Sequence, residues 1–267
     1  MNVIMPYHGA AIRSGSWDGG QHADRSRELR RANGADTRAT RGDGLPDARS
    51  VLAVVGRPGD EATYLGALLD AFRAGGTEVS ALALTTGEVA PGQGGSESRS
   101  PTVNHSSEFE VSALVLRVTH RLMADYPDGG LAAIPAHERV RGIVGMIRRC
   151  SADLLLTADS AGVDPLVLET TCAAGRAEGV PVLAWTLPAG VADEVRAAGG
   201  LGVPDHPLWR ADLMLKVSRR AQRRAMRAHR SLGDASPAHL VRLDVQGDRE
   251  WLRWLVLPAS PAGGREG

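Results

Sequence analysis

The chain has very little lysine, few aromatic residues and few cysteines. Lys216 is the single lysine among 267 residues, aromatic side chains make up 4% of the sequence, and there are two cysteines. Cys150 and Cys172 both lie in helix-like stretches and form no CxxC motif, which excludes a disulfide framework and a cysteine zinc site. We therefore expect a protein of a reducing cytoplasm.

Excess charge and long apolar runs are also missing. Lys+Arg and Asp+Glu each number 31, so the formal net charge is zero and no global field attracts nucleic acid or an acidic membrane. No apolar run approaches the ~20 residues that cross a bilayer, and the N-terminus lacks the basic-then-apolar order of a secretion signal. These absences predict a soluble, cytoplasmic protein with no membrane partner.

Hydrophobic periodicity divides the chain into three parts. Residues 1–48 are rich in Gly, Arg, Asp and Ser and have little apolar periodicity, which predicts a disordered N-terminal arm. Apolar runs fill the region from Val51 onward, so we place one α/β domain at 49–258. A flexible tail at 259–267 completes the predicted organisation.

Within the domain, short apolar runs alternate with helical periods. Strands are predicted at 51–55, 78–85, 120–125, 153–158 and 181–187, and helices at 61–74, 106–117, 136–150 and 165–178. Strands that are apolar on both faces and separated by helices predict a Rossmann-like, mostly parallel sheet covered by helices on both faces. Beyond Gly199 we predict a strand in "ADLMLKV", a basic helix at 218–231, and two strands around a Gly-Asp turn in "HLVRLDVQGDREWLRWLVLP".

Ligands of such sheets bind at the carboxyl ends of the strands. The loop after the first strand reads Gly56-Arg57-Pro58-Gly59-Asp60-Glu61. A guanidinium beside a helix N-terminus favours an anion such as a carboxylate or a phosphate. Asp60 and Glu61 have two interpretations. In the first, which is favoured, they stabilise the positive end of the helix or one of them pairs with Arg57; in the second, they take part in chemistry.

Further polar residues follow the other predicted strands. The candidate substrate-binding residues are Arg57, Glu61, Thr86, Glu88, Asp128, Asp159 and Asp164. The competing interpretation is that the acids among them cap helices and form turns. The histidines show no HxH or HxxxH spacing, so they predict no metal ligands.

Several stretches resemble the LmbE/PIG-L family of zinc-dependent N-deacetylases over most of 51–258. The similar segments are "VLAVVGRPGDE", "EVSALALTTGE", "EFEVSALVLRV", "DYPDGGL", "ADLLLTADSAGV", "GVPVLAWTLP", "RAMRAHRSL" and "GDREWLRWLV". The resemblance implies an LmbE-like fold and, in the family, hydrolysis of an N-acetyl group with a zinc cofactor.

The zinc motif of the family is altered here. Family members carry Ala-His-Pro-Asp-Asp-Glu after the first strand, where the His and the second Asp bind zinc and the first Asp is the general base. Arg57 stands at the His position, and a guanidinium has no lone pair for a metal. Gly59 replaces the base, and "SAGVDPLVLETT" has no histidine where the family has a Gly-His-Pro-Asp-His-like segment. We therefore expect no zinc cofactor.

The resemblance also indicates which groups could move protons. His229 in "RAHRSL" lies where the family has a similar His-x-Ser, and Asp60 is what remains of the first motif. These two residues are the candidate catalytic groups.

The leading hypothesis is a divergent protein that has lost zinc-dependent deacetylation. It would be a small-molecule-binding pseudoenzyme or a metal-independent tailoring enzyme of bacterial specialised metabolism, with an anionic or sugar-like ligand. One alternative is a residual zinc amidase or deacetylase acting on an N-acetyl sugar or a thiol conjugate. Another is an interaction protein that uses the Arg-rich helix 218–231, although a solvated or acid-paired helix face is favoured over nucleic-acid binding.

Overall fold

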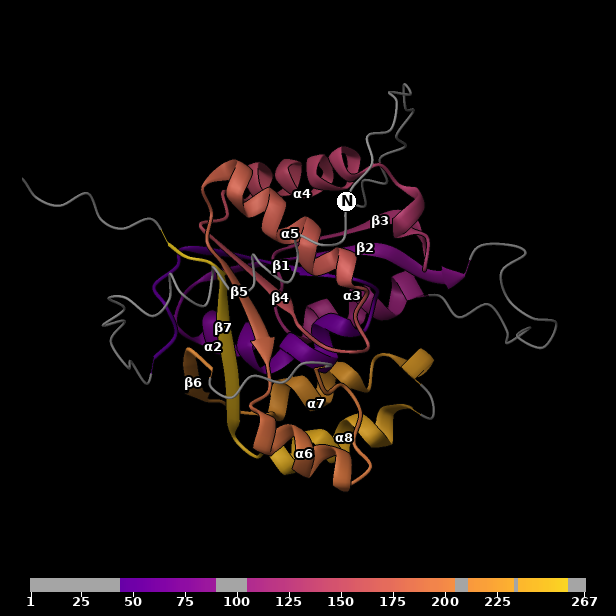
Figure 1. The fold of residues 1–267 in the computed structure, drawn as a ribbon, viewed down its shortest axis with the longest axis vertical. Coiled ribbons are helices and arrows are strands. Elements are labelled where there is room, and N and C mark those ends of the chain that lie inside the picture. The colour runs from indigo at the N-terminus through magenta and orange to yellow at the C-terminus, as the bar shows by residue number, and fades with distance from the viewer. Residues whose placement is uncertain (1–43, 90–104, 205–210, 233–234, 259–267) are drawn as a thin grey trace, which may run out of the picture. The chain divides into compact units, whose positions relative to one another are not determined.

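The computed structural model describes residues 44–89, 105–204, 211–232 and 235–258, which form one sheet covered by helices (Figure 1). Most of the predicted arm and the whole predicted tail fall outside the described residues, so both remain predictions.

The sheet has seven strands in the order β3-β2-β1-β4-β5-β7-β6. The strands are β1 (Ser50–Val55), β2 (Glu78–Val89), β3 (His120–Asp128), β4 (Leu154–Ala158), β5 (Val182–Thr186), β6 (Leu213–Lys216) and β7 (Arg249–Val256). The first five in spatial order run parallel, and β7 runs antiparallel to both β5 and β6. The predicted mostly parallel α/β sheet is therefore confirmed.

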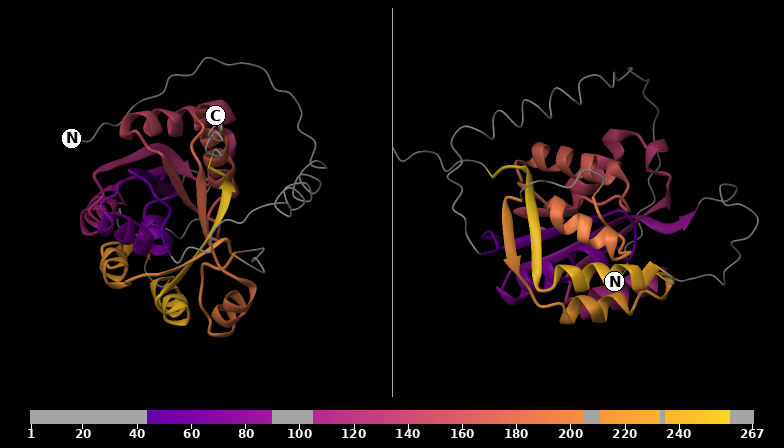
Figure 2. Two further views of the ribbon diagram at one scale, coloured as in Figure 1. Left: turned by 90° about the vertical axis from the view of Figure 1, so that its left-hand side faces the viewer. Right: turned by 60° about the horizontal axis from the view of Figure 1, so that its bottom comes forward.

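Helices cover both faces of this sheet. They are the π-helix η1 (Glu61–Leu65), α2 (Gly66–Ala74), α3 (His105–Val115), α4 (Ala136–Cys150), α5 (Pro165–Glu178), α6 (Ala189–Ala197), α7 (Arg220–Met226) and α8 (Ala235–Gln246), with 3-10 turns η2 (Leu131–Ala133) and η3 (Arg230–Leu232). α4 and α5 lie on one face, and α2, α3 and α7 lie on the other (Figures 1 and 2).

The central strand β1 is buried along its whole length because its neighbours flank both edges and helices cover both faces. Val51 pairs with Val79 of β2 and with Leu154 of β4. This two-sided burial explains why β1, β4 and β5 read as continuous apolar runs rather than alternating ones. The chain leaves β1 toward β2 on one side and returns to β4 on the other.

Residues at the helix ends explain why the sequence predicted the bounds of α4 and α5 correctly. The Asp164 side chain caps α5 by accepting a hydrogen bond from the Leu166 backbone N–H, and Pro165 begins the helix, where its missing N–H is harmless. α4 ends at Ser151 in the left-handed conformation. Both helices occupy the predicted ranges.

Four predictions along the chain were wrong. Residues 235–246 form helix α8, and only β7 of the two late strands exists, because buried side chains recur there at helical spacing (His239, Arg242, Leu243 and Gln246). The basic helix is shorter than predicted and ends at Met226. Helix α6 was not predicted. Strand β2 extends beyond its predicted end at residue 85 and β3 beyond its predicted end at residue 125, so Asp128 is part of β3.

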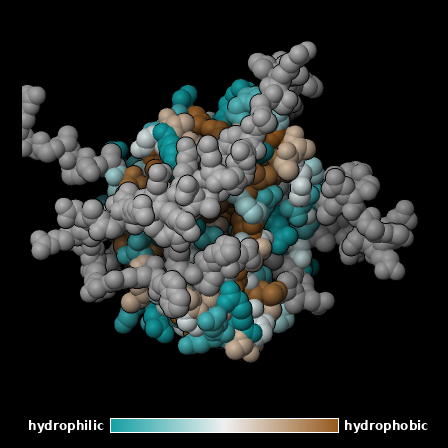
Figure 3. Space-filling view, in the orientation of Figure 1, coloured by the Kyte–Doolittle hydropathy of each residue, from teal (hydrophilic) through white to brown (hydrophobic). Residues whose placement is uncertain are grey.

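Within the described residues, no helix combines the length and the apolar character that crossing a membrane requires. Hydrophilic and hydrophobic residues are interspersed on the face shown in Figure 3.

Candidate functional site

A small pocket lies at the carboxyl end of β1, where the order of the strands reverses. Such reversal points are the usual ligand sites of open α/β sheets. The pocket has a volume of about 40 Å³, room for roughly two or three water molecules. Its lining residues are Gly56, Arg57, Asp60, Thr85, Asp128, Leu131, Gly162 and Asp164.

Arg57 forms a bridge between two carboxylates of this pocket. Its Nε lies 3.8 Å from Asp60 Oδ1, and its Nη1 lies 3.6 Å from Asp128 Oδ2. The Arg57 side chain is half exposed, whereas that of Asp60 is nearly buried. Asp60 directly precedes η1 and Asp128 ends β3, so this one cation joins acids from two separate elements.

Asp60 is held inside the pocket by the turn that precedes η1. Its Oδ2 accepts a hydrogen bond of 3.1 Å from the Arg57 backbone N–H. Burial raises the pKa of Asp60 to about 7, and the positive charge of Arg57 opposes the rise only in part. This carboxyl group can therefore take up or release a proton near neutral pH.

Gly59 gives the loop a conformation that other residues rarely adopt. Its φ is +102°, a region that glycine reaches without steric strain. The Gly59 N–H then donates to Glu61 Oε2 at 2.7 Å. The shape of the loop thus depends on the glycine at position 59.

The remaining polar groups of the pocket come from β2, β3 and the start of α5. The Thr85 hydroxyl donates to the Gly56 carbonyl at 3.0 Å and lies 3.5 Å from Asp128 Oδ1. Asp164 lines the pocket while one of its oxygens caps α5. The structure therefore brings together four predicted site residues, which are Arg57, Asp60, Asp128 and Asp164.

Glu61 and His229, two further predicted site residues, lie behind the pocket rather than in it. Both side chains are fully buried, and His229 Nε2 lies 2.6 Å from Glu61 Oε1. Ser112 Oγ donates to the same carboxylate at 2.7 Å. The hydrogen bonds and charges of Glu61 raise the pKa of His229, although burial alone would lower it. The pair therefore joins η1 to the segment after α7 and supports the loop that carries Asp60.

Three other predicted residues lie outside the pocket lining. The Thr86 hydroxyl accepts a hydrogen bond from the Glu88 backbone N–H, and the Glu88 side chain is exposed. Asp159 pairs with Arg253 of β7 at 2.8 Å.

Tyr64 and Gly162 were missed by the sequence reasoning. Tyr64 is nearly fully buried, and its hydroxyl bonds to Ser160. A Cβ added at Gly162, which lines the pocket, would lie 2.7 Å from that hydroxyl. A tyrosine four residues after Asp60 could have indicated this position, because both project from the same side of a helical turn.

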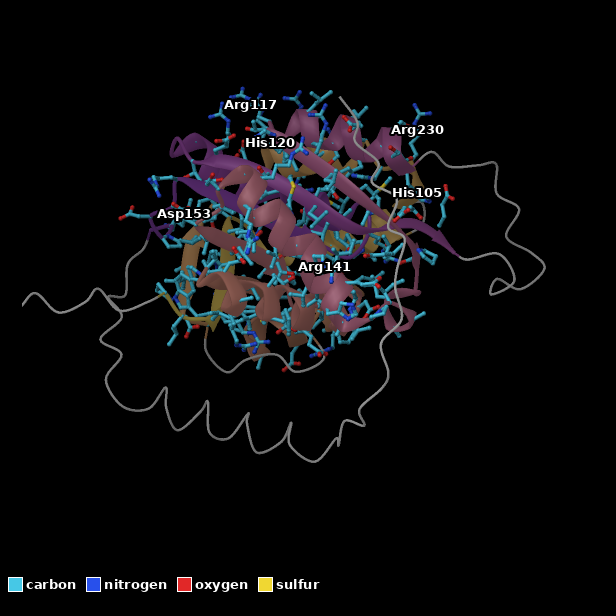
Figure 4. All side chains as sticks on the ribbon, turned by 90° about the horizontal axis from the view of Figure 1, so that it is seen from above. His105, Arg117, His120, Arg141, Asp153 and Arg230 are labelled. Carbon is cyan, nitrogen blue, oxygen red and sulfur yellow. The ribbon has the colours of Figure 1, made fainter. Side chains whose placement is uncertain are left out.

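The basic helix is partly paired with acids. Arg219 contacts buried Glu250, and Arg223 contacts Asp244. The exposed arginines of this stretch are Arg220, Arg224, Arg227 and Arg230, and the Arg230 side chain extends outward at the periphery of the fold in Figure 4.

The described residues contain no group of three or more His, Cys, Asp or Glu side chains placed to hold a metal ion. In the pocket, the nearest cation to Asp60 and Asp128 is the guanidinium of Arg57.

The fold is that of a deacetylase-like α/β protein. Residues 52–166 match the family model of GlcNAc-PI de-N-acetylase, PIG-L. The resemblance to the LmbE/PIG-L family is therefore confirmed. No curated protein matches the chain.

Solved structures share the fold at low sequence identity. A deacetylase of the antimicrobial A40926 pseudoaglycone is 22% identical, with a TM-score of 0.58 over 80% of this chain and 100% of that one. N,N'-diacetylchitobiose deacetylase from Pyrococcus horikoshii, solved with its inhibitor, is 16% identical, with a TM-score of 0.53 over 90% and 94%.

One similar structure has a different activity. The 4-carboxy-2-hydroxymuconate hydratase from Pseudomonas putida is 14% identical, with a TM-score of 0.58 over 80% of this chain and 98% of that one. Relatives of this fold thus include enzymes of more than one reaction class, and likeness at this identity establishes the fold alone.

Proposed function

We propose that this protein binds a small hydroxylated molecule in the pocket at the end of β1 and has lost zinc-dependent N-deacetylation. The observation that carries the proposal is the position of Arg57, whose guanidinium lies between the carboxylates of Asp60 and Asp128. The chain's own guanidinium thus supplies the positive charge beside these carboxylates, where the family would have a bound zinc ion.

Zinc does not fit the residues present. A zinc site needs three or four compact nitrogen, oxygen or sulfur ligands around the ion. Asp60 is the one carboxylate that matches a ligand position of the family, and Arg57 is its nearest charged neighbour. A fixed positive charge 3.8 Å from the carboxylate would repel a divalent ion.

The charges of the pocket support a hydroxylated ligand better than an anionic one. Three carboxyl groups and one guanidinium line it, so an added anion would meet more negative than positive charge. The contacts of Arg57 with the two acids exceed hydrogen-bond length, which leaves N–H donors and carboxylate acceptors side by side. A hydroxyl group both donates and accepts, so adjacent hydroxyls of a sugar-like molecule could use both partners.

Asp60 is the group that we propose for any remaining chemistry, because its pKa of about 7 allows proton transfer near neutral pH. His229 would then hold the loop through Glu61 rather than contact a ligand. The protein would act as a pseudoenzyme or as a metal-independent tailoring enzyme in bacterial specialised metabolism.

Zinc analysis together with a binding assay tests the proposal. The purified protein should contain far less than one zinc per chain, and it should show no chelator-sensitive release of acetate from N-acetylglucosamine. Saturation-transfer NMR with N-acetylglucosamine, glucosamine and methyl glucoside should detect binding that Arg57→Met and Asp128→Asn each weaken by about tenfold or more. Glu88→Gln, at an exposed residue outside the pocket, serves as the control.

The competing function, a residual zinc amidase, gives the opposite results. Stoichiometric zinc and acetate release abolished by a chelator would refute the proposed loss of hydrolysis. We expect Arg57→His/Gly59→Asp not to restore zinc binding, since an aspartate at φ +102° is strained and the histidine after β4 is still missing.

A further inference from the structure

Arg242 of α8 is a fully buried arginine that forms no ion pair with a carboxylate in the described part of the chain. Its side chain has no exposed surface, and Nη2 donates to the Thr63 carbonyl. Nε and Nη1 have no hydrogen-bond acceptor among the described residues. Burial lowers the pKa of Arg242 to about 10, so the group still carries a full positive charge at neutral pH.

The nearby carboxylate, Glu250, is already occupied. It accepts a hydrogen bond of 2.6 Å from Trp185 Nε1 and one of 3.1 Å from Gln246 Nε2. Its ion-pair partner is Arg219. The buried Arg242 and the partly buried Arg219 thus share the one buried carboxylate of Glu250, and among the described residues one positive charge is left without a carboxylate partner. Such a charge is strongly unfavourable unless an opposite charge accompanies it.

His239 lies one turn before Arg242 on the same face of α8. It is nearly buried, and its Nδ1 has no hydrogen-bond partner among the described residues. Burial, with the positive charges of Arg242 and Arg57, lowers the pKa of His239 to about 4. The ring is therefore neutral at pH 7, and in the tautomer with the proton on Nδ1 it offers that N–H as a donor.

Aromatic rings enclose this pair of residues. The Arg242 guanidinium carbon lies 5.0 Å from the centre of the Tyr64 ring and 4.8 Å from that of Trp185. The His239 ring meets Tyr64 edge-on at 5.9 Å. Cation–π contacts offset part of the buried charge, but they satisfy no N–H donor.

We propose that Arg242 and His239 hold a small monovalent anion, a halide or a small carboxylate, at a site separate from the pocket at the end of β1. Neither residue lines that pocket. Water could satisfy the free N–H groups, whereas an anion also cancels the charge. The inference does not depend on the proposed function, because it rests on a different set of residues.

Thermal unfolding at constant ionic strength tests the site. The wild-type chain is compared in sodium gluconate, whose anion is too large for an enclosed site, and in the same concentration of sodium bromide or sodium acetate. Bromide or acetate should raise the Tm by roughly 5 °C at a hundredfold excess over its Kd. A rise with bromide alone assigns a halide site, and a rise with acetate alone assigns a carboxylate site.

Arg242→Met should abolish the anion-specific rise, while Arg223→Met should keep it because Arg223 pairs with Asp244 at the surface. If Arg242→Met does not fold, wild-type crystals soaked in bromide give the answer, with an anomalous peak expected beside the Arg242 guanidinium. Equal Tm values in all three salts, or a rise that persists in Arg242→Met, would overturn the proposal. Where bromide raises the Tm of the wild type, crystals with no bromide beside Arg242 would overturn it as well.

Discussion

Replacing His229 by leucine should destabilise the protein far more than removal of a surface ion pair. The substitution keeps a side chain of similar size but removes the imidazole that faces Glu61 Oε1 at 2.6 Å. Glu61 would keep its hydrogen bonds from Ser112 and from the Gly59 N–H. Its charge would lose the one cation in contact with it among the described residues.

The expected loss follows from the burial of the pair. Both side chains have 0% exposure, and removing one partner of a buried ion pair costs about 3–5 kcal/mol because the other charge stays buried. For a domain of this size, we expect the Tm to fall by roughly 6–20 °C. Arg148→Gln is the matched control, because Arg148 pairs with Glu178 at 70% exposure of the arginine side chain. Such surface pairs contribute little to stability because water and salt screen them.

The pH dependence has a definite sign. The folded pKa of His229 is raised above its ordinary value of 6.5, so the stabilisation is fully present below about pH 6.5. It is lost as the pH rises through the raised folded value. The deficit of His229→Leu relative to wild type should therefore be largest near pH 6 and should shrink in more alkaline buffer.

Differential scanning calorimetry of wild type, His229→Leu and Arg148→Gln at several pH values measures these differences. If His229→Leu lowers the Tm no more than Arg148→Gln does, the buried pair does not hold the loop and the reasoning is refuted.

Two further predictions concern the pocket. Asp60→Asn should stabilise the protein at pH 8 but not at pH 4. The folded pKa of Asp60 is about 7 against an ordinary value of 3.8, so the stability of the wild type falls as the pH rises between these values, by roughly 4 kcal/mol at most. A Tm equal to that of the wild type at both pH values would contradict this. Gly162→Ala should lower the Tm because the new Cβ lies 2.7 Å from the Tyr64 hydroxyl, and adding Tyr64→Phe should recover most of the loss, since the next ring atom lies 4.0 Å away. No recovery in the double variant would mean that the clash lies elsewhere.

The sequence predicted the elements whose signals are local. β1, β4 and β5 are apolar on both faces, and α5 begins at a capping Asp164 followed by Pro165. The hydrophobic pattern and the capping residues were therefore enough to locate these elements. Residues 235–246 misled the prediction because a helix with buried polar residues such as Arg242 and Gln246 lacks a clear apolar stripe. Its burial depends on partners from distant parts of the chain.

The pocket was predicted in part for the same reason. Arg57, Asp60 and Asp164 follow strands, and parallel strands bring their carboxyl ends to one edge, so the site residues could be gathered in advance. The local sequence did not determine whether Arg57 would contact an external anion or acidic residues of the chain itself. Asp128 lies 71 positions further along the sequence, and it contacts Arg57 only because β1, β2 and β3 are neighbours in the sheet.

The amino-acid order by itself thus determined the α/β class, the loop after β1 that lines the pocket and the guanidinium at position 57, because these depend on residue types and short-range periodicity. The tertiary structure decided that Arg57 bridges two carboxylates, that His229 is buried against Glu61, and that Arg242 is enclosed by aromatic rings. Each of those facts joins side chains from separate elements, and their distances and desolvation exist only after the sheet has formed.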